Sequence, residues 1–226
     1  MGVNMKGKIT VITTLLQFSI MAFNIESLDK SLSQINDYNK ENHIRIEHAK
    51  ELLGKRFGRS IASSDVDHKD ITELIKTTAI RTLPRKFKKQ ANIIAKTIIE
   101  QSMIYKMDPV FLSAIIMNES SFNPIAKGSS GEIGLMQILP STGKWMAKKI
   151  KMKWRGSKTL SNPIQNIKLG AAYVNLLRNK YKHGQLYLAA YNMGPGNLRK
   201  ALSKKIRPKD YTVAVMKRYF TIYKSI

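Results

Sequence analysis

Glu119 is the residue whose type and position most clearly indicate chemistry. It lies in the segment Met117-Asn118-Glu119-Ser120, at the end of an apolar stretch with helical spacing. A carboxyl group at a helix C-terminus has a raised pKa because the helix dipole places partial negative charge there, and burial raises the pKa further. Basic surroundings lower it, although screening weakens distant cations. Glu119 is therefore a candidate general acid; the alternative is a solvated glutamate at a helix end.

Two other motifs carry side chains suited to binding a sugar. The first is Gly134-Leu135-Met136-Gln137, in which glycine permits a tight turn or the close approach of a ligand. Gln137 offers a donor and an acceptor for hydroxyl and acetamido groups, and Met136 offers an apolar surface for a sugar face. The second is Tyr191-Asn192, which can orient a substrate or hold a carboxyl group. Taken alone, either motif also fits an ordinary loop or a tyrosine in the core.

Carboxylates are scarce in the part of the chain that holds these motifs. Residues 81–226 contain 28 Lys and Arg but only five acidic residues, which are Glu100, Asp108, Glu119, Glu132 and Asp210. Glycosidases ordinarily use two carboxyl groups. We expect Asp108 to be a helix N-cap, so Glu132 is the serious candidate for a second one. A single acid/base suffices if the substrate supplies the nucleophile.

The composition excludes several classes of protein. The 226 residues include no cysteine, which rules out disulfides and thiolate sites, and the four histidines have no metal-type spacing. We therefore expect no metal and no cofactor. The net charge of +24 indicates a polyanionic partner or surface. Because aromatic residues are not interleaved with the basic runs, we expect no nucleic acid. The basic clusters are Lys144, Lys148, Lys149, Lys151, Lys153 and Arg155, and then Lys204, Lys205, Arg207 and Lys209.

The elements that position these motifs are predicted to be helices. Asp108 followed by Pro109 is typical of a helix start, and so is Asn162 followed by Pro163. Apolar periodicity predicts further helices over 91–103, 163–181, 186–191 and 211–223. The helix over 186–191 is expected to stop at Gly194-Pro195-Gly196. Strand-like alternation is not evident, so the sequence predicts a mainly α protein.

The charge pattern divides the chain into regions. Residues 1–23 have two lysines before a short apolar stretch, which predicts a signal peptide or an uncleaved signal anchor. An ordinary buried helix is the alternative. Residues 24–86 are predicted to be a helical N-terminal spacer region of unknown role. Residues 87–226 contain all three motifs and are predicted to form one domain, whose function depends on those motifs.

The motifs together resemble the soluble lytic transglycosylase (SLT) family of lysozyme-like enzymes over about residues 88–225. The resemblance rests on Asp108-Pro109, Glu119-Ser120-x-Phe122-Asn123-Pro124, Gly134-Leu135-Met136-Gln137, Asn162-Pro163 with Gly170 and Tyr173, and Ala190-Tyr191-Asn192-x-Gly194. It implies a lysozyme-like helical domain with Glu119 as the catalytic acid/base. It also implies substrate-binding roles for Ser120, Met136, Gln137, Tyr191 and Asn192. Many relatives have a serine where this chain has Gly128, so Ser129 and Ser130 are the candidate assisting hydroxyls.

The resemblance further implies cleavage of peptidoglycan between N-acetylmuramic acid (MurNAc) and N-acetylglucosamine (GlcNAc), with 1,6-anhydro-MurNAc ends. The basic surface would then attract the enzyme to an anionic cell wall. We expect export to the periplasm or cell envelope, with membrane anchoring as an option for the N-terminus. Two alternatives remain open. One is a muramidase that hydrolyses the same bond, and the other is a non-catalytic basic module that binds peptidoglycan or nucleic acid.

Overall fold

The computed structural model describes residues 27–33, 36, 39–64 and 68–225. The predicted signal segment, residues 1–23, lies outside the described residues. The chain divides into two units, Met1–Glu41 and Asn42–Ile226. The described residues of the first unit are helical. Within the described ranges, no helix is both long enough and apolar enough to span a membrane.

The second unit is built from helices, which confirms the predicted mainly α class. Helical residues 42–53 are followed by the short 3-10 helices η1 (Gly54–Arg59) and η2 (Ile61–Ser63). The remaining elements are α2 (His68–Thr82), η3 (Arg85–Gln90), α3 (Ala91–Tyr105), α4 (Pro109–Ser120), α5 (Pro140–Lys149), α6 (Ser157–Ser161), α7 (Pro163–Tyr181), α8 (Gly184–Ser203) and α9 (Asp210–Tyr223). In the described part of the chain, β structure is limited to isolated bridges that join Ile133 to Lys127 and to Ile138.

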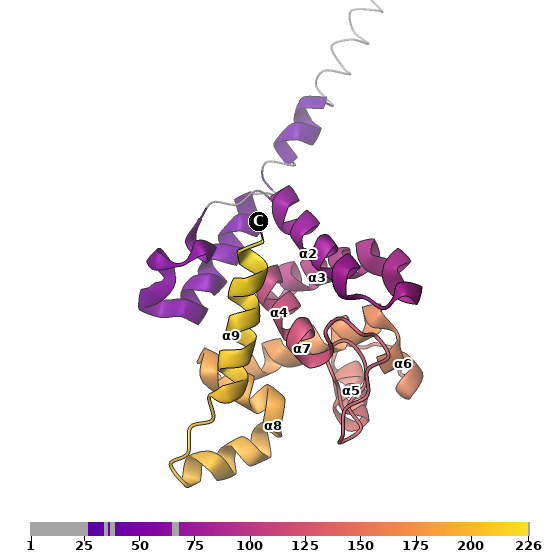
Figure 1. Cartoon of the computed structure of the whole chain (residues 1–226), viewed down its shortest axis with the longest axis vertical. Coiled ribbons are helices and arrows are strands. Elements are labelled where there is room, and N and C mark those ends of the chain that lie inside the picture. Colours follow the sequence, from indigo (N-terminus) through magenta and orange to yellow (C-terminus); the bar gives the residue numbers. More distant parts are fainter. Residues whose placement is uncertain (1–26, 34–35, 37–38, 65–67, 226) are drawn as a thin grey trace, which may run out of the picture. The chain divides into compact units, whose positions relative to one another are not determined.

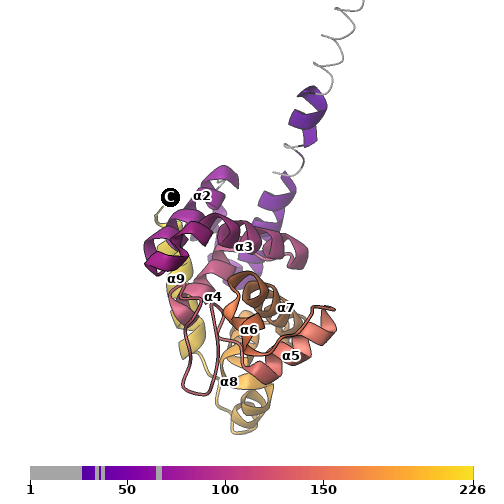
Figure 2. The same cartoon turned by 90° about the vertical axis from the view of Figure 1, so that its right-hand side faces the viewer.

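Helix α4 forms the centre of the core. Its residues Val110 to Ile116 are all buried, and α9 lies along it while α3 packs beside it (Figure 1). Helix α7 packs against α3 and α8, and the short helices α5 and α6 contact α7 (Figure 2). An apolar helix buried on every side must have its polar ends satisfied by other elements. The two ends of α4 therefore determine how the site is built.

The predicted helix starts are confirmed. Oδ1 of Asp108 accepts a hydrogen bond from Val110 N at 2.8 Å, and Oδ1 of Asn162 accepts one from Gln165 N at 3.0 Å. The predicted end at Gly194 is a break with φ 80° and ψ 148°. Pro195 then starts another helical segment that continues to Ser203, which the sequence pattern did not predict. A proline in a first helical turn costs no hydrogen bond, so the segment 194–196 both ends one helix and starts the next.

Asp108 does more than cap α4. Its Oδ2 accepts hydrogen bonds from the hydroxyls of Tyr219 at 2.6 Å and Tyr223 at 2.8 Å, both on α9. Arg45 donates to the Tyr223 hydroxyl at 3.2 Å and to the carbonyl of Ala62 at 2.9 Å. Asp108, Arg45, Tyr219 and Tyr223 are all buried. This buried polar network joins the start of α4 to the end of α9 and to residues 45–62.

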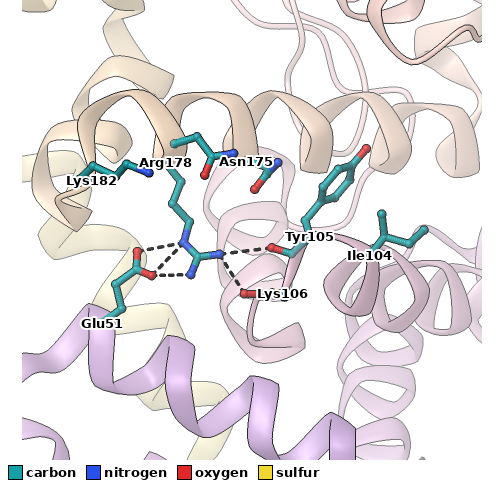
Figure 3. A pocket seen from close by; sticks show the side chains of 8 residues that line it. Glu51, Ile104, Tyr105, Lys106, Asn175, Arg178 and Lys182 are labelled. Atoms are coloured by element: carbon teal, nitrogen blue, oxygen red, sulfur yellow. Dashed lines mark hydrogen bonds and ion pairs between the residues drawn. The ribbon is translucent and has the colours of Figure 1, made fainter.

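The segment 42–53 is also tied to α3 and α7 through Arg178. Its guanidinium pairs with the Glu51 carboxylate, with Nε 2.9 Å from each oxygen (Figure 3). It also donates to the carbonyls of Tyr105 and Lys106 at the end of α3, at 3.2 and 2.8 Å. These bonds satisfy carbonyls that a helix C-terminus leaves free. Glu51, Arg178 and the end of α3 line a pocket of about 510 Å³.

Part of the predicted spacer therefore belongs to the same compact unit as Glu119 and the motifs around it. Residues 42–64 contribute Arg45, and His48 Nδ1 accepts a hydrogen bond from Asp108 N at 3.1 Å. Helix α2 packs along α3 and contacts α4. The compact unit begins at Asn42.

The buried network gives a prediction about stability. Replacing Tyr219 with Phe leaves the shape of the side chain but removes a hydrogen bond to a buried carboxylate, which we expect to cost about 1.5–3 kcal/mol of unfolding free energy. Tyr187→Phe is the matched control, because Tyr187 is fully buried and its hydroxyl has no partner among the described residues. Urea denaturation measures both changes. If Tyr187→Phe costs as much as Tyr219→Phe, the network contributes nothing beyond packing.

Candidate active site

Glu119 lies in the last turn of α4, where the backbone turns sharply away. Ser121 and Phe122 adopt the left-handed conformation with φ of 49° and 60°, although neither is glycine. The amide of Ser121 still donates to the carbonyl of Met117 at 3.1 Å, and the Phe122 side chain is fully buried. Burial of Phe122 offsets the strain of its backbone. This turn directs the chain from α4 into the loop of residues 122–139, beside Glu119.

Tyr211 at the start of α9 donates a hydrogen bond to Oε1 of Glu119. The pKa of Glu119 is raised from 4.5 to about 7: burial raises it most, the hydrogen bond from Tyr211 lowers it, and the negative charge of Glu132 raises it. Burial thus raises the pKa of Glu119 as the sequence predicts, and this effect is larger than the lowering by the Tyr211 hydrogen bond. A carboxyl group with a pKa near 7 is protonated in about half of the molecules at neutral pH, so it can both donate and accept a proton.

The loop beside Glu119 is held from three sides. Ser120 Oγ donates to the carbonyl of Leu135 at 2.8 Å, and the Tyr191 hydroxyl donates to the carbonyl of Met136 at 2.7 Å. Buried Asn166, on α7, accepts from Met136 N at 2.8 Å and donates to Ile133 O at 2.8 Å. Gly134 has φ 84°, and a Cβ there would overlap the Asn166 amide. Glycine is therefore required at 134 for the loop to approach α7.

Met136 and Gln137, which the sequence predicts to contact substrate, instead stabilise the loop itself. The Met136 side chain is fully buried against Gly170, so it presents no apolar surface to a sugar. Its contribution passes through its backbone, which Asn166 and Tyr191 hold. Gln137 Nε2 donates to Gly134 O at 2.9 Å and to Ala126 O at 3.2 Å, so its amide group closes the loop on itself. Its Oε1 remains the atom that faces Gly128.

The part of the loop over 128–132 contains the second carboxylate. Glu132 Oε2 accepts a hydrogen bond from Ser130 N at 3.0 Å. A Cβ at Gly128 would overlap this oxygen and would lie 2.9 Å from Gln137 Oε1. Glu132 thus occupies the space that a larger residue at 128 would need. Ser129 and Ser130 are exposed.

A row of aromatic rings runs from the Glu119 carboxyl across four helices, α9, α8, α7 and α5. Tyr211 stacks on Tyr191 at 6.4 Å between centroids, Tyr191 contacts Tyr173 at 5.6 Å, and Tyr173 meets the edge of Trp145 at 6.4 Å. Burial raises the pKa of Tyr191 and Tyr211 well above the usual value, so both hydroxyls remain donors. Asn192 follows Tyr191 and is exposed, two residues before the break at Gly194.

The arrangement brings together Glu119, Ser120, Gln137 and Tyr191 around one loop, with Glu132 near enough for its charge to act on Glu119. Chemically it offers one carboxyl group that can donate and accept a proton, beside a loop that Ser120, Gln137 and Tyr191 hold through its carbonyls. In the described part of the chain, no three His, Asp or Glu side chains are grouped as metal ligands would be.

Tyr211 is the functional residue that the sequence motifs did not indicate. It is separated from Glu119 by 92 positions, and no short motif contains both. A signal was nevertheless present in the spacing. Asp108 and Glu119 are 11 residues apart, about three helical turns, and Tyr211 and Tyr223 are 12 apart, so two antiparallel helices can place both pairs in contact.

Several known proteins are similar to this chain. The family model described as the transglycosylase SLT domain matches residues 96–213, about half of the chain. A putative soluble lytic murein transglycosylase of Haemophilus influenzae is 41% identical over 95 residues, which cover 42% of this chain and 16% of the relative. Membrane-bound lytic murein transglycosylase C of Pectobacterium atrosepticum is 31% identical over 140 residues, covering 58% and 39%. The chain therefore spans less than half the length of these relatives.

Solved structures show a likeness as well. The 70 kDa soluble lytic transglycosylase of Escherichia coli has a TM-score of 0.49 and 22% sequence identity, over 69% of this chain and 29% of that one. A lytic transglycosylase Slt from Pseudomonas aeruginosa has a TM-score of 0.46 and 20% identity, over 82% and 34%.

The electrostatics of Glu119 can be measured without an activity assay. We expect a carbon-13 NMR titration of the Glu119 carboxyl to have a midpoint of about 7. Glu132→Gln removes a negative charge that favours the protonated form, so the midpoint should fall. Tyr211→Phe removes a hydrogen bond that favours the ionised form, so the midpoint should rise. Shifts in the opposite directions would contradict the assigned environment of Glu119.

Proposed function

We propose that this chain, which belongs to the transglycosylase SLT domain family, is a lytic transglycosylase that cleaves the glycan strands of peptidoglycan. The observation that carries the proposal is the state of Glu119. It is a largely buried carboxyl group with a pKa of about 7, held by Tyr211 beside a loop that other side chains fix in place. Such a group can serve as acid and then as base within one reaction.

We propose the following sequence of steps. The protonated Glu119 gives its proton to the glycosidic oxygen as the bond between C1 of MurNAc and O4 of GlcNAc breaks. The resulting carboxylate then takes the proton of the C6 hydroxyl of the same MurNAc, whose oxygen bonds to C1. The products are a free GlcNAc hydroxyl and a 1,6-anhydro-MurNAc end, and Glu119 is again protonated. Because the nucleophile is already tethered, proximity favours the closure.

Hydrolysis of the same bond is the second candidate function. It needs a base or nucleophile in addition to the acid, as in glycosidases with two carboxyl groups. Glu132 is the residue that gives this alternative a basis, because its charge acts on Glu119. Against it, one Glu132 oxygen accepts a hydrogen bond from the loop backbone at Ser130. The transglycosylase reaction needs only one carboxyl group and is therefore preferred.

The basic surface is proposed to bring the enzyme to its substrate. Muramic acid and the peptides of peptidoglycan carry carboxylates, and a positive surface raises the rate of encounter with them. We propose that the protein acts in the cell envelope, where this polymer is found, and that residues 1–23 serve as a signal peptide or anchor. A binding module without turnover is the remaining alternative, and any release of muropeptides would eliminate it.

The first test of the function concerns the acid. Glu119→Gln preserves the shape and removes the transferable proton, so release of soluble muropeptides from purified sacculi should fall by about 100- to 10,000-fold. Circular dichroism and the melting temperature serve as the control for folding. If the variant keeps more than roughly a tenth of the activity, Glu119 is not the acid.

The second test concerns Glu132 and separates the two reactions. In the transglycosylase reaction we expect Glu132→Ala to keep anhydro products and to cost less than about tenfold in rate, or ~1.4 kcal/mol of barrier. Mass spectrometry distinguishes the products, because hydrolysis adds the mass of one water molecule. Hydrated products, or a loss as large as that of Glu119→Gln, would support the hydrolase instead.

A further inference from the structure

Trp145 is exposed in a protein that buries or half-buries its other described aromatic rings. Among the described residues it is the only Phe, Tyr or Trp in the exposed class, with 46% of its surface accessible. The chain has one other tryptophan, Trp154, which follows α5 in the sequence. Its ring packs against Gly143, a residue of α5. Trp154 thus has a packing role, whereas Trp145 leaves a large apolar surface in solvent. An exposed indole offers a ligand both a broad apolar face and an N–H donor.

The position of Trp145 links it to Glu119. Its edge rests on Tyr173, which is buried, and the row continues through Tyr191 to Tyr211, the partner of Glu119. Helix α5 also begins directly after the fixed loop, with Pro140 as its first residue. Trp145 therefore lies at the far end of the aromatic row that begins at the tyrosine partner of Glu119.

The charge around Trp145 favours an anionic ligand. Lys149, one turn later on α5, places Nζ over one face of the indole ring, 5.1 Å from its centroid, so a sugar would take the opposite face. Residues 133–209 contain 17 Lys and Arg and no Asp or Glu, so the side chains in this part of the sequence offer Lys149 no carboxylate. The flat face of an indole suits the C–H face of a sugar, and the adjacent ammonium suits a carboxylate.

We propose that Trp145 and Lys149 form a distal subsite for a MurNAc unit of the glycan strand, with the indole against the sugar ring and Lys149 on a carboxylate of that unit. This inference rests on the proposed function and names a part of the strand that the enzyme holds away from the cleaved bond. Two carboxylates have the required chemistry. One is the lactyl carboxylate, exposed when an amidase removes the peptide, and the other belongs to the peptide itself.

Binding measurements test the subsite separately from catalysis. In a Glu119→Gln, Trp154→Phe background, Trp145 is the only tryptophan, so its fluorescence reports directly on the subsite. We expect chitohexaose, amidase-treated strands and peptide-bearing strands each to change its emission. In the Glu119→Gln background, isothermal titration calorimetry should show that Trp145→Ala weakens binding of all three about tenfold. Unchanged emission, or unchanged affinity in Trp145→Ala, would overturn the proposal.

Lys149→Gln tests the carboxylate. It should weaken binding of a charged strand about fivefold and leave chitohexaose within about twofold, since chitohexaose has no carboxylate. Loss with amidase-treated strands assigns the lactyl carboxylate, and loss with peptide-bearing strands alone assigns the peptide. Lys180→Gln is the matched control, because Lys180 lies 5.5 Å from the ring of Tyr181, outside the row. Equal loss with chitohexaose, or equal loss in Lys180→Gln, would overturn the role of Lys149.

The two levels of the proposal can fail separately. If the wild-type protein releases no anhydro products from sacculi but Trp145 still reports strand binding, the reaction is wrong and the subsite remains. If anhydro products form and neither Trp145→Ala nor Lys149→Gln changes the affinity for strands, the reaction remains and the subsite is wrong.

Discussion

The buried carboxylate of Asp108 determines how α4 and α9 pack, and the rest of the site depends on that packing. It caps the start of α4 and accepts hydrogen bonds from two tyrosines near the end of α9. The antiparallel pairing that results carries the start of α9 to the end of α4, where Tyr211 reaches Glu119. A buried carboxylate costs much free energy unless its oxygens are satisfied. Because the Asp108 oxygens must be satisfied, they fix how far α9 is shifted along α4. Apolar packing alone would specify this register less strongly.

The same requirement explains why the segment before the family motifs belongs to the folded unit. Arg45 supplies positive charge and hydrogen bonds to the network around Asp108, and Arg178 joins Glu51 to the end of α3. Both are contacts between positions far apart in sequence. The local sequence pattern of residues 24–86 indicates only polar, helix-favouring segments. It contains no feature that predicts their contacts with the site.

The sequence predicts features that depend on neighbouring residues, but not those that depend on contacts between distant helices. Asp108-Pro109 and Asn162-Pro163 gave correct helix starts because caps act within a few residues. Glu119 was identified from its place at the end of an apolar helix, and burial does raise its pKa. Tyr211 was missed because its role arises only when α9 meets α4. Met136 was read as an exposed surface, yet it is buried, since the loop folds inward onto Gly170.

The crowding between Gly128 and Glu132 has a consequence for how this site can change over generations. A Cβ at 128 and the Glu132 carboxylate require the same space. Residue identities at the two positions are therefore not independent: a serine at 128, which the family resemblance leads us to expect, suits a chain whose residue 132 is small or turned away. Because the atoms met first belong to the end of the flexible Glu132 side chain, a Cβ at 128 fits once that carboxylate turns away and gives up its hydrogen bond from Ser130 N. A residue larger than glycine at 128 would therefore act first on the position of the Glu132 carboxylate and not on the path of the loop.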